Sequence, residues 1–220
     1  MATLNWQDID TVLLDMDGTM LDLAYDNFFW NEHVPVQYMQ KHQMGVEEMQ
    51  AQLLPHFEKL KGTLQWYCTD HWSTLTGLNI RELKQQTTDK IRLLPTTHTF
   101  LQAVRAMNPR KKIYLVTNAH PDSLSVKLAH TDITPYFDGI FSVHNFGAPK
   151  ESQAFWQAFH AQNPFDPART LLVEDTLPIL DAAEAFGIAY RRAIAHPDTR
   201  LPPREIPAPY VSVMGLGELV

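Results

Sequence analysis

The sequence predicts an α/β fold, in which helices flank a parallel β-sheet and a helical unit is inserted after the first strand. Three observations support this prediction. Four short apolar runs each end in polar or acidic residues, helical periodicity separates the later runs, and a long stretch after the first run has no strand pattern. Runs without polar alternation are typical of strands buried on both faces, as in a parallel sheet. The runs are residues 12–14, 113–116, 140–143 and 171–173.

Helical patterns lie between the later runs and before the second one. Apolar residues recur there at helical spacing, and Pro121 lies near the start of one helix, a position that proline favours. Such alternation of strands and helices indicates right-handed crossovers. A proline-rich connection over 201–209 leads to a last short strand, 210–213. We expect the helices at about 100–107, 123–130, 152–160 and 177–186.

The stretch from about residue 22 to 95 departs from this alternation. It is helical in pattern and rich in aromatic residues, Gln and Met, with glycines that interrupt it at 45, 62 and 77. A single connection between a strand and a helix rarely needs so many residues. We therefore predict two domains, a sheet-containing core of residues 1–21 and 96–220 and a helical cap domain of residues 22–95.

Composition excludes several classes of function. The 220 residues carry a formal net charge of −7, which argues against a nucleic-acid partner because phosphate backbones attract a surplus of Lys and Arg. No apolar stretch approaches the length of a membrane span, and residues 1–10 lack the pattern of a signal peptide. Cys68 is the only cysteine, which suits a reducing cytoplasm. We expect a cytoplasmic monomer or homodimer, without membrane or nucleic-acid partners, that binds a small molecule.

Two acids, Asp15 and Asp17, directly follow the first run, and Gly18 and Thr19 let the chain turn tightly around a small anion. Ligands of an open parallel sheet bind beyond the carboxyl ends of its strands, so the acids that follow other runs converge there. Carboxylates this close repel each other unless a cation intervenes. Mg²⁺ is the natural cation, with Asp175 after the fourth run as a further ligand. The pattern predicts Asp15 as a nucleophile toward phosphorus and Asp17 as the proton-transfer group.

Thr117 and Asn118 follow the second run where a helix is expected to begin. Backbone N–H groups and the helix dipole at such a point favour a phosphate. In isolation the pair would indicate a helix N-cap, and both roles use the same donors. Lys150, after the third run, supplies a point charge for the phosphate and for Asp15. Phosphoryl transfer needs a nucleophile, a metal and cations around the phosphate oxygens, so the four strand ends together predict that reaction.

These motifs resemble those of the haloacid dehalogenase superfamily, namely DMDGT, VTN, the Lys150 loop and VED. Members of that superfamily are Rossmann-like phosphohydrolases that form an aspartyl-phosphate and bind Mg²⁺. The resemblance implies that Asp15 is the nucleophile and a metal ligand, and that Asp175 is a second ligand. It implies that Asp17 is the acid–base and lends its carbonyl oxygen to the metal. The implied phosphate binders are Gly18, Thr117, Asn118 and Lys150, of which Lys150 also balances charge.

Four longer segments resemble the purine 5′-nucleotidases of this superfamily, which act on GMP and IMP: WQDIDTVLLDMDGTMLDLAYDNFFW, LQWYCTDHWSTLTGL, VTNAHPDSLSVKLAHT and FGAPKESQAFW. The resemblance includes the cap, where substrate choice resides in such enzymes. It implies hydrolysis of purine nucleoside monophosphates. Asn27 and Trp30, which follow the first hinge, are the substrate-binding candidates. Glu174 stands where those enzymes carry Asp, and we expect it to lie behind the metal ligands.

Alternative interpretations accompany these predictions. A sugar-phosphate phosphatase or a phosphomutase on the same scaffold would carry the same motifs, and a non-catalytic binding protein could retain the fold. Most aromatic residues of a small helical domain simply form its core. Asp22 suits a helix cap, and Asp181 suits a local hydrogen-bonding or surface role. The ten histidines show no metal-ligand spacing such as His-Glu-x-x-His, so the sequence predicts no zinc site.

Overall fold

The computed structural model describes residues 4–220, and these residues contain a six-stranded sheet in which all neighbouring strands pair in parallel. The strand order is β3-β2-β1-β4-β5-β6. This order places β1 between β2 and β4, so the end of β1 lies in the middle of the sheet edge. The strands are β1 (Thr11–Leu14), β2 (Lys112–Thr117), β3 (Gly139–Ser142), β4 (Thr170–Glu174), β5 (Tyr190–Ile194) and β6 (Ser212–Val213).

The four apolar runs predicted as strands are confirmed to within one residue at each end. The strand β5 was not predicted, because Arg191 and Arg192 interrupt its apolar pattern. The last strand is shorter than predicted and covers only Ser212–Val213 rather than 210–213. Its two residues pair with the last two residues of β5, at the edge of the sheet, where no second neighbour extends the pairing.

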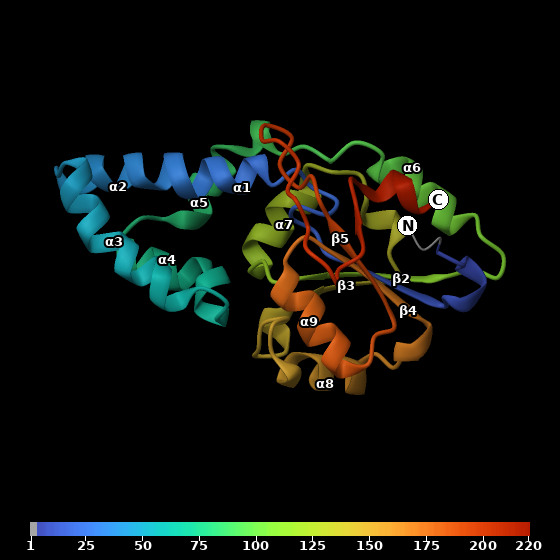
Figure 1. Ribbon diagram of the computed structural model, residues 1–220. Coiled ribbons are helices and arrows are strands. Elements are labelled where there is room, and N and C mark those ends of the chain that lie inside the picture. The colour runs from blue at the N-terminus through green and yellow to red at the C-terminus, as the bar shows by residue number, and fades with distance from the viewer. Residues whose placement is uncertain (1–3) are drawn as a thin grey trace.

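Helices cover both faces of the sheet. Val12 and Leu14 of β1 belong to a buried cluster that includes residues of α6 and α7. Leu13, which points to the opposite face, belongs to a cluster with residues of α8 and α9. All three side chains are fully buried, as the unbroken apolar run predicted. In Figure 1, α8 and α9 lie together on one side of the sheet. These helices are α6 (Thr97–Arg105), α7 (Pro121–Ala129), α8 (Gln153–Gln162) and α9 (Leu177–Phe186).

Residues 22–95 form helices without a strand and extend to the left of the sheet in Figure 1. This helical extension has a core of its own, in which Phe29 and Trp72 are buried together with Ile80. The prediction that cap aromatics form a core is thus confirmed for Phe29 and Trp72. The division into two domains at residues 22 and 95 stays a prediction. The helices are α1 (Ala24–Phe28), α2 (Val34–His42), α3 (Val46–Leu60), α4 (Thr69–Thr76) and α5 (Ile80–Gln85).

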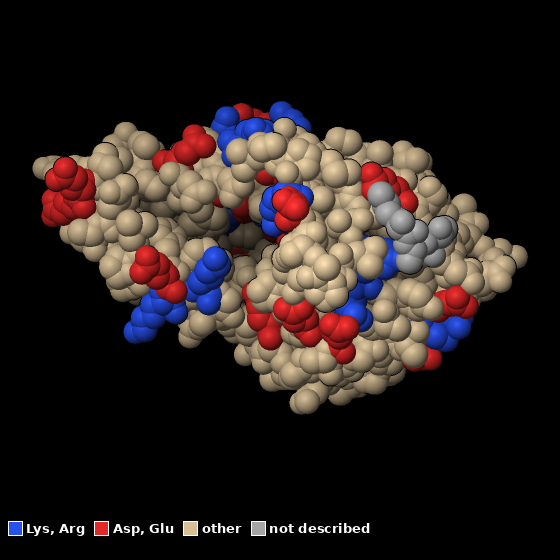
Figure 2. Space-filling model, viewed as in Figure 1, with Lys and Arg blue, Asp and Glu red and all other residues tan. Residues whose placement is uncertain are grey.

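Polar contacts join the helical extension to the core. The Tyr67 hydroxyl, before α4, donates to Oε1 of Glu151 at 2.7 Å. Asn27 of α1 donates to Oδ2 of Asp198, in the loop after β5, at 2.8 Å. Helix α5 packs against α7. Figure 2 shows a hollow between the helical extension and the rest of the molecule, with charged side chains of both signs at its rim.

Candidate active site

The chain turns sharply at Gly18, four residues after β1. Gly18 has a φ of +83°, in the left-handed region that favours glycine. A Cβ atom at this position would lie 2.7 Å from Cγ of Asp175, so glycine is needed for the two strand ends to approach this closely. The Gly18 N–H donates to the Leu21 carbonyl at 2.7 Å. The role of Gly18 in this structure is therefore the close approach, and phosphate binding by it stays a prediction.

Lys150 lies at the centre of the site and is fully buried. Its Nζ is 2.5 Å from Oδ1 of Asp15 and 2.7 Å from Oε2 of Glu174, and it donates to the Val116 carbonyl at 3.0 Å. Burial alone would lower the pKa of Lys150, but the two carboxylates outweigh it and raise that pKa. Lys150 is therefore a permanently charged ammonium held against the carboxylate predicted as the nucleophile.

Three buried carboxylates gather beside this ammonium. The ligand oxygens of Asp15, Glu174 and Asp175 lie within 4.8 Å of one another. Burial is the main cause that raises the pKa of Asp15 and of Glu174 to about 7 and that of Asp175 to about 6. Lys150 contacts two of the three acids, and Arg204 lies 3.9 Å from Asp175, so negative charge is still in excess when all three are ionised. An all-oxygen ligand set with excess negative charge fits a hard divalent cation.

Glu174 shapes the loop that carries Asp175. Its Oε1 accepts the backbone N–H groups of Asp175 at 3.1 Å and of Thr176 at 3.2 Å, while its other oxygen binds Lys150. Arg204, in the loop after β5, donates to the Asp175 carbonyl at 2.7 Å from the other side. The sequence did not indicate Arg204, because a proline-rich loop has no periodicity that would place it beside a strand end 29 residues earlier.

Asp17 does not join the three-carboxylate cluster; its side chain is paired with Lys127 of α7 at 2.6 Å. Lys127 also contacts Asp26 of α1 at 2.5 Å, and Lys84 of α5 approaches Asp26 at 3.4 Å. Both lysines are buried. This chain of charges connects the predicted acid–base to the helical extension. Sequence reasoning missed it, because Lys127 lies between Leu124 and Leu128, on a helix that was interpreted only by its apolar face.

Burial is the largest single influence on the pKa values of these linked acids and lysines. It raises the pKa of Asp17 to about 7, although Lys127 opposes the rise. It lowers the pKa of Lys84 to about 8, although Asp26 opposes that change. The pKa of Lys127 is instead raised, because Asp17 and Asp26 together outweigh its burial. An Asp17 carboxyl that exchanges its proton near neutral pH matches the requirement for a general acid and base.

Thr117 and Asn118 are buried at the end of β2, one strand away from Asp15. The Thr117 hydroxyl accepts the Ala119 N–H at 3.0 Å, and Oδ1 of Asn118 accepts the Lys150 N–H at 3.0 Å. The Asn118 amide donates to Glu151 at 2.9 Å, and this is the carboxylate that Tyr67 also contacts. The pair therefore holds the turn before α7 and the Lys150 loop together, and phosphate binding by it stays a prediction.

The two cap residues predicted to bind substrate already have protein partners. Asn27 binds Asp198, as described above, and Trp30 packs edge-on against Phe29 at 5.1 Å between ring centroids. Asp22 lies one residue before the N-cap of α1, Leu23, and its carboxylate accepts the N–H groups of Ala24 at 3.0 Å and of Thr199 at 3.1 Å. Asp181 is exposed and accepts the hydroxyl of Tyr210, 29 residues away, at 2.6 Å, so it has a surface role and its hydrogen bond is not a local one. Substrate binding by Asn27 and Trp30 stays a prediction.

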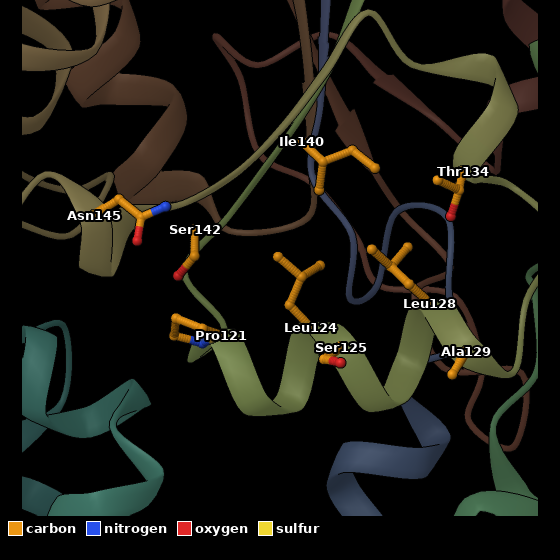
Figure 3. Close-up of a pocket in the computed structure, with 9 residues that line it drawn as sticks. All are labelled: Pro121, Leu124, Ser125, Leu128, Ala129, Thr134, Ile140, Ser142 and Asn145. Carbon is orange, nitrogen blue, oxygen red and sulfur yellow. The ribbon is translucent and has the colours of Figure 1, made fainter.

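A pocket between α7 and β3 lies outside this site. Figure 3 shows Leu124 and Leu128 pointing from α7 toward Ile140 of β3. None of its lining residues is charged, so the pocket offers no cation for a phosphate and no carboxylate for a metal. Its lining residues are Pro121, Leu124, Ser125, Leu128, Ala129, Thr134, Ile140, Ser142 and Asn145.

The fold and the carboxylate–lysine site agree with the comparison of the chain with known families. The sequence model of the haloacid dehalogenase-like hydrolases matches residues 9–187. The chain belongs to this family, and it is an enzyme of the phosphoric monoester hydrolase class. Sequence resemblance had implied the same family from the four motifs alone.

The chain is also similar to individual proteins and solved structures. The chain is 42% identical over 194 residues to the GMP/IMP nucleotidase YrfG of Escherichia coli K12. The aligned region covers 88% of this chain and 86% of that protein. The YrfG protein of Shigella flexneri matches equally. Among solved structures, a HAD phosphatase from Thermococcus onnurineus has a TM-score of 0.79 at 19% identity, with 96% of each chain covered. An L-2-haloacid dehalogenase from Xanthobacter autotrophicus has a TM-score of 0.63 at 18% identity, again with 96% of each chain covered. At such identities the structural likeness shows the fold alone.

Proposed function

We propose that this enzyme is a Mg²⁺-dependent purine 5′-nucleotidase that hydrolyses GMP and IMP to nucleoside and phosphate through an aspartyl-phosphate on Asp15. The main support for the proposed reaction is the buried Asp15 carboxylate, which Lys150 contacts at the end of the central strand β1. The proposed substrates, GMP and IMP, are supported by the 42% identity to the GMP/IMP nucleotidase, in an alignment that covers 88% of the chain. An alignment of that length includes most of the helical extension, where substrate choice is expected to reside.

In the proposed reaction, one oxygen of Asp15 attacks the substrate phosphorus, and the bond to the nucleoside oxygen breaks. Asp17 gives its proton to that leaving oxygen, and it later takes a proton from the water that cleaves the aspartyl-phosphate. Lys150 holds Asp15 in place and offsets the charge of the phosphate. Asp15, Asp175 and the Asp17 carbonyl would hold Mg²⁺, which supplies positive charge for the phosphate oxygens.

Metal binding is expected to stabilise the protein more at about pH 8 than at about pH 5. Burial raises the pKa of Asp15, Glu174 and Asp175, so the folded state keeps protons that the unfolded chain releases. Their contribution to stability is therefore present below about pH 4 and is lost as pH rises to about 7. Bound Mg²⁺ would offset this loss only where the acids are ionised. Thermal unfolding with Mg²⁺ or with EDTA measures the difference, with a shift of about 5 °C expected at about pH 8 and 100 times Kd.

The variant Asp175→Asn is the matched test of this site, because it removes one carboxylate from the cluster and keeps the side-chain size. We expect most of the Mg²⁺-induced shift to disappear in it, whereas the exposed variant Asp89→Asn should shift like the wild type. Equal shifts at both pH values in the wild type would contradict metal binding by these acids.

Substrate preference is tested by following free phosphate from GMP, IMP, AMP, UMP and hexose phosphates in the presence of Mg²⁺. We expect GMP and IMP to be hydrolysed with the highest kcat/KM. Equal rates on hexose phosphates would replace the nucleotidase with a sugar-phosphate phosphatase on the same scaffold. Conversion of one hexose phosphate into its isomer, without release of phosphate, would instead identify a phosphomutase.

The cytoplasm is the compartment that we propose for this reaction. Cys68 is a free thiol, which suits a reducing environment. Among residues 4–220, no helix has the length and apolar character needed to cross a membrane. We propose a small-molecule nucleotide as the partner, bound by a monomer or a homodimer.

A further inference from the structure

Three side chains that commonly bind transition metals meet where the helical extension contacts the core. Cys68 directly precedes α4, His120 directly precedes α7, and His144 lies in the short turn after β3. The ligand atoms of these three residues lie within 4.8 Å of one another. They are 24 to 76 residues apart in the sequence, so only the folded chain brings them together. This cluster is separate from the carboxylates around Asp15.

A fourth ligand lies beside them. Oδ2 of Asp70, in the first turn of α4, is 3.6 Å from Nε2 of His120. Thiolate sulfur, imidazole nitrogen and carboxylate oxygen are the ligands of tetrahedral Zn²⁺, at about 2.3 Å for sulfur and about 2.0–2.2 Å for nitrogen and oxygen. Ligand atoms of such a site are roughly 3.3–3.8 Å apart. The separations in the structure, within 4.8 Å for the first three groups and 3.6 Å between Asp70 and His120, are close to this spacing.

Local structure prepares two of these groups for a metal. The Cys68 sulfur accepts the His71 N–H at 3.4 Å, at the N-terminus of an eight-residue helix, and this contact orients the sulfur. The His144 ring packs edge-on against the His120 ring, with 4.8 Å between the ring centroids. Its Nε2 is buried and has no hydrogen-bond partner within the described residues. A buried ring nitrogen without a hydrogen-bond partner is a candidate ligand atom for an ion.

His120 is oriented by groups behind it. Its Nδ1 lies 2.9 Å from the Thr69 hydroxyl and accepts the Asp122 N–H at 3.3 Å, as the cap of α7. These contacts hold the orientation of the ring, as contacts behind metal-binding histidines usually do. With Nδ1 held there, Nε2 is the atom left to face Asp70. The His120 ring therefore has both a candidate metal-facing nitrogen and its supporting contacts.

We propose that Cys68, His120 and His144, with Asp70 as the fourth ligand, form a binding site for Zn²⁺ or a similar divalent transition-metal ion. The sulfur and nitrogen ligands distinguish this site from the all-oxygen cluster, which suits Mg²⁺. Cys68 and Asp70 belong to the helical extension, whereas the two histidines belong to the core. A bound ion would thus link these two parts directly and restrain their relative movement. The inference does not depend on which phosphate ester the enzyme hydrolyses.

Co²⁺ is the probe that tests the site, because thiolate-bound Co²⁺ has a charge-transfer absorption in the near ultraviolet. Cys68 is the only cysteine, so this absorption can come from no other site in the chain. The full-length protein is titrated at neutral pH with excess Mg²⁺, which occupies the oxygen cluster, and with a reductant that contains no thiol. We expect the absorption to saturate at one Co²⁺ per chain and to disappear when Zn²⁺ is added.

Conservative variants then identify the ligands. Cys68→Ser and His120→Asn keep a side chain that can cap the following helix, so folding should be preserved. Cys68→Ser should abolish the absorption, and His120→Asn and His144→Asn should weaken Co²⁺ binding by roughly 10–100-fold or more. His98→Asn, a half-exposed histidine paired with Asp132 on the surface, is the control and should bind like the wild type. Thermal unfolding confirms that each variant is folded.

Two results would overturn the proposal. The first is Co²⁺ binding to the wild type without thiolate absorption, or no binding beyond the Mg²⁺-blocked cluster. The second is an absorption that persists with wild-type affinity in both histidine variants, which would show that the cysteine binds the ion without them.

Discussion

The variant Asp15→Asn is expected to lose turnover of GMP by at least ~10²–10⁴-fold, the loss typical of a positioned catalytic group. An amide has no charged oxygen with which to attack phosphorus, so no aspartyl-phosphate can form. Stability should not fall, because burial already disfavours the ionised form of Asp15 and raises its pKa to about 7. Lys150 also keeps its second carboxylate, Glu174, at 2.7 Å. Phosphate release and thermal unfolding, measured together, separate lost chemistry from lost folding.

The matched control is Asp89→Asn, which makes the same change at an exposed position of the helical extension. It should retain wild-type turnover. Unchanged activity in Asp15→Asn would remove Asp15 as the nucleophile. A loss of activity accompanied by unfolding would show that the carboxylate is needed for the fold, which its raised pKa argues against.

The variant Lys150→Met is expected to lower both stability and turnover. It leaves Asp15 and Glu174 buried without the cation that lies 2.5 and 2.7 Å from them. Removal of one partner from a buried ion pair typically costs about 3–5 kcal/mol of unfolding free energy. The cost should be smaller at about pH 5 than at about pH 8, because both acids, whose pKa is raised to about 7, become neutral at the lower pH. Turnover should fall at least ~10²-fold, because the nucleophile loses its positioning contact.

Urea unfolding at the two pH values measures the stability part of this prediction. Lys59→Met, which removes an exposed lysine of α3, is the control and should change the unfolding free energy by less than about 0.5 kcal/mol. A Lys150→Met protein with wild-type stability at both pH values would show that the two acids are protonated in the folded state, with no need of a cation.

Much of the fold was predictable because its signals are local. Four of the six strands, β1 to β4, are short apolar runs, and polar or acidic residues follow each of them. The strand β5 was missed for the same reason, since its Arg191 and Arg192 are hydrophilic when viewed alone. In the folded chain Arg191 pairs with Glu184 of α9, and Arg192 is buried. The tertiary structure accommodates these charges in a way that no local pattern indicates.

The candidate site divides in a similar way. Asp15, Lys150 and Asp175 were identified from residues adjacent to strand ends, and the parallel topology does bring them together. The pairing of Asp17 with Lys127 was not identified. These residues are 110 positions apart. The apolar spacing of Leu124 and Leu128 was enough to predict the helix that carries Lys127, and it gave no reason to assign Lys127 a partner. The Cys68–His120–His144 cluster was missed because metal motifs are recognised by short spacing, and this one spans two structural units.

By itself the sequence determined the strand ends, the family resemblance and the acids beside the central strand, because each depends on residues that are neighbours along the chain. Only the tertiary structure decided which distant groups surround them. It placed Lys127 against Asp17, Arg204 against Asp175, and Asn27 against Asp198. These contacts depend on how the helical extension and the loop after β5 pack onto the sheet. Such packing depends on the sum of many weak contacts between buried atoms across the molecule, so it cannot be predicted from any single segment of the sequence.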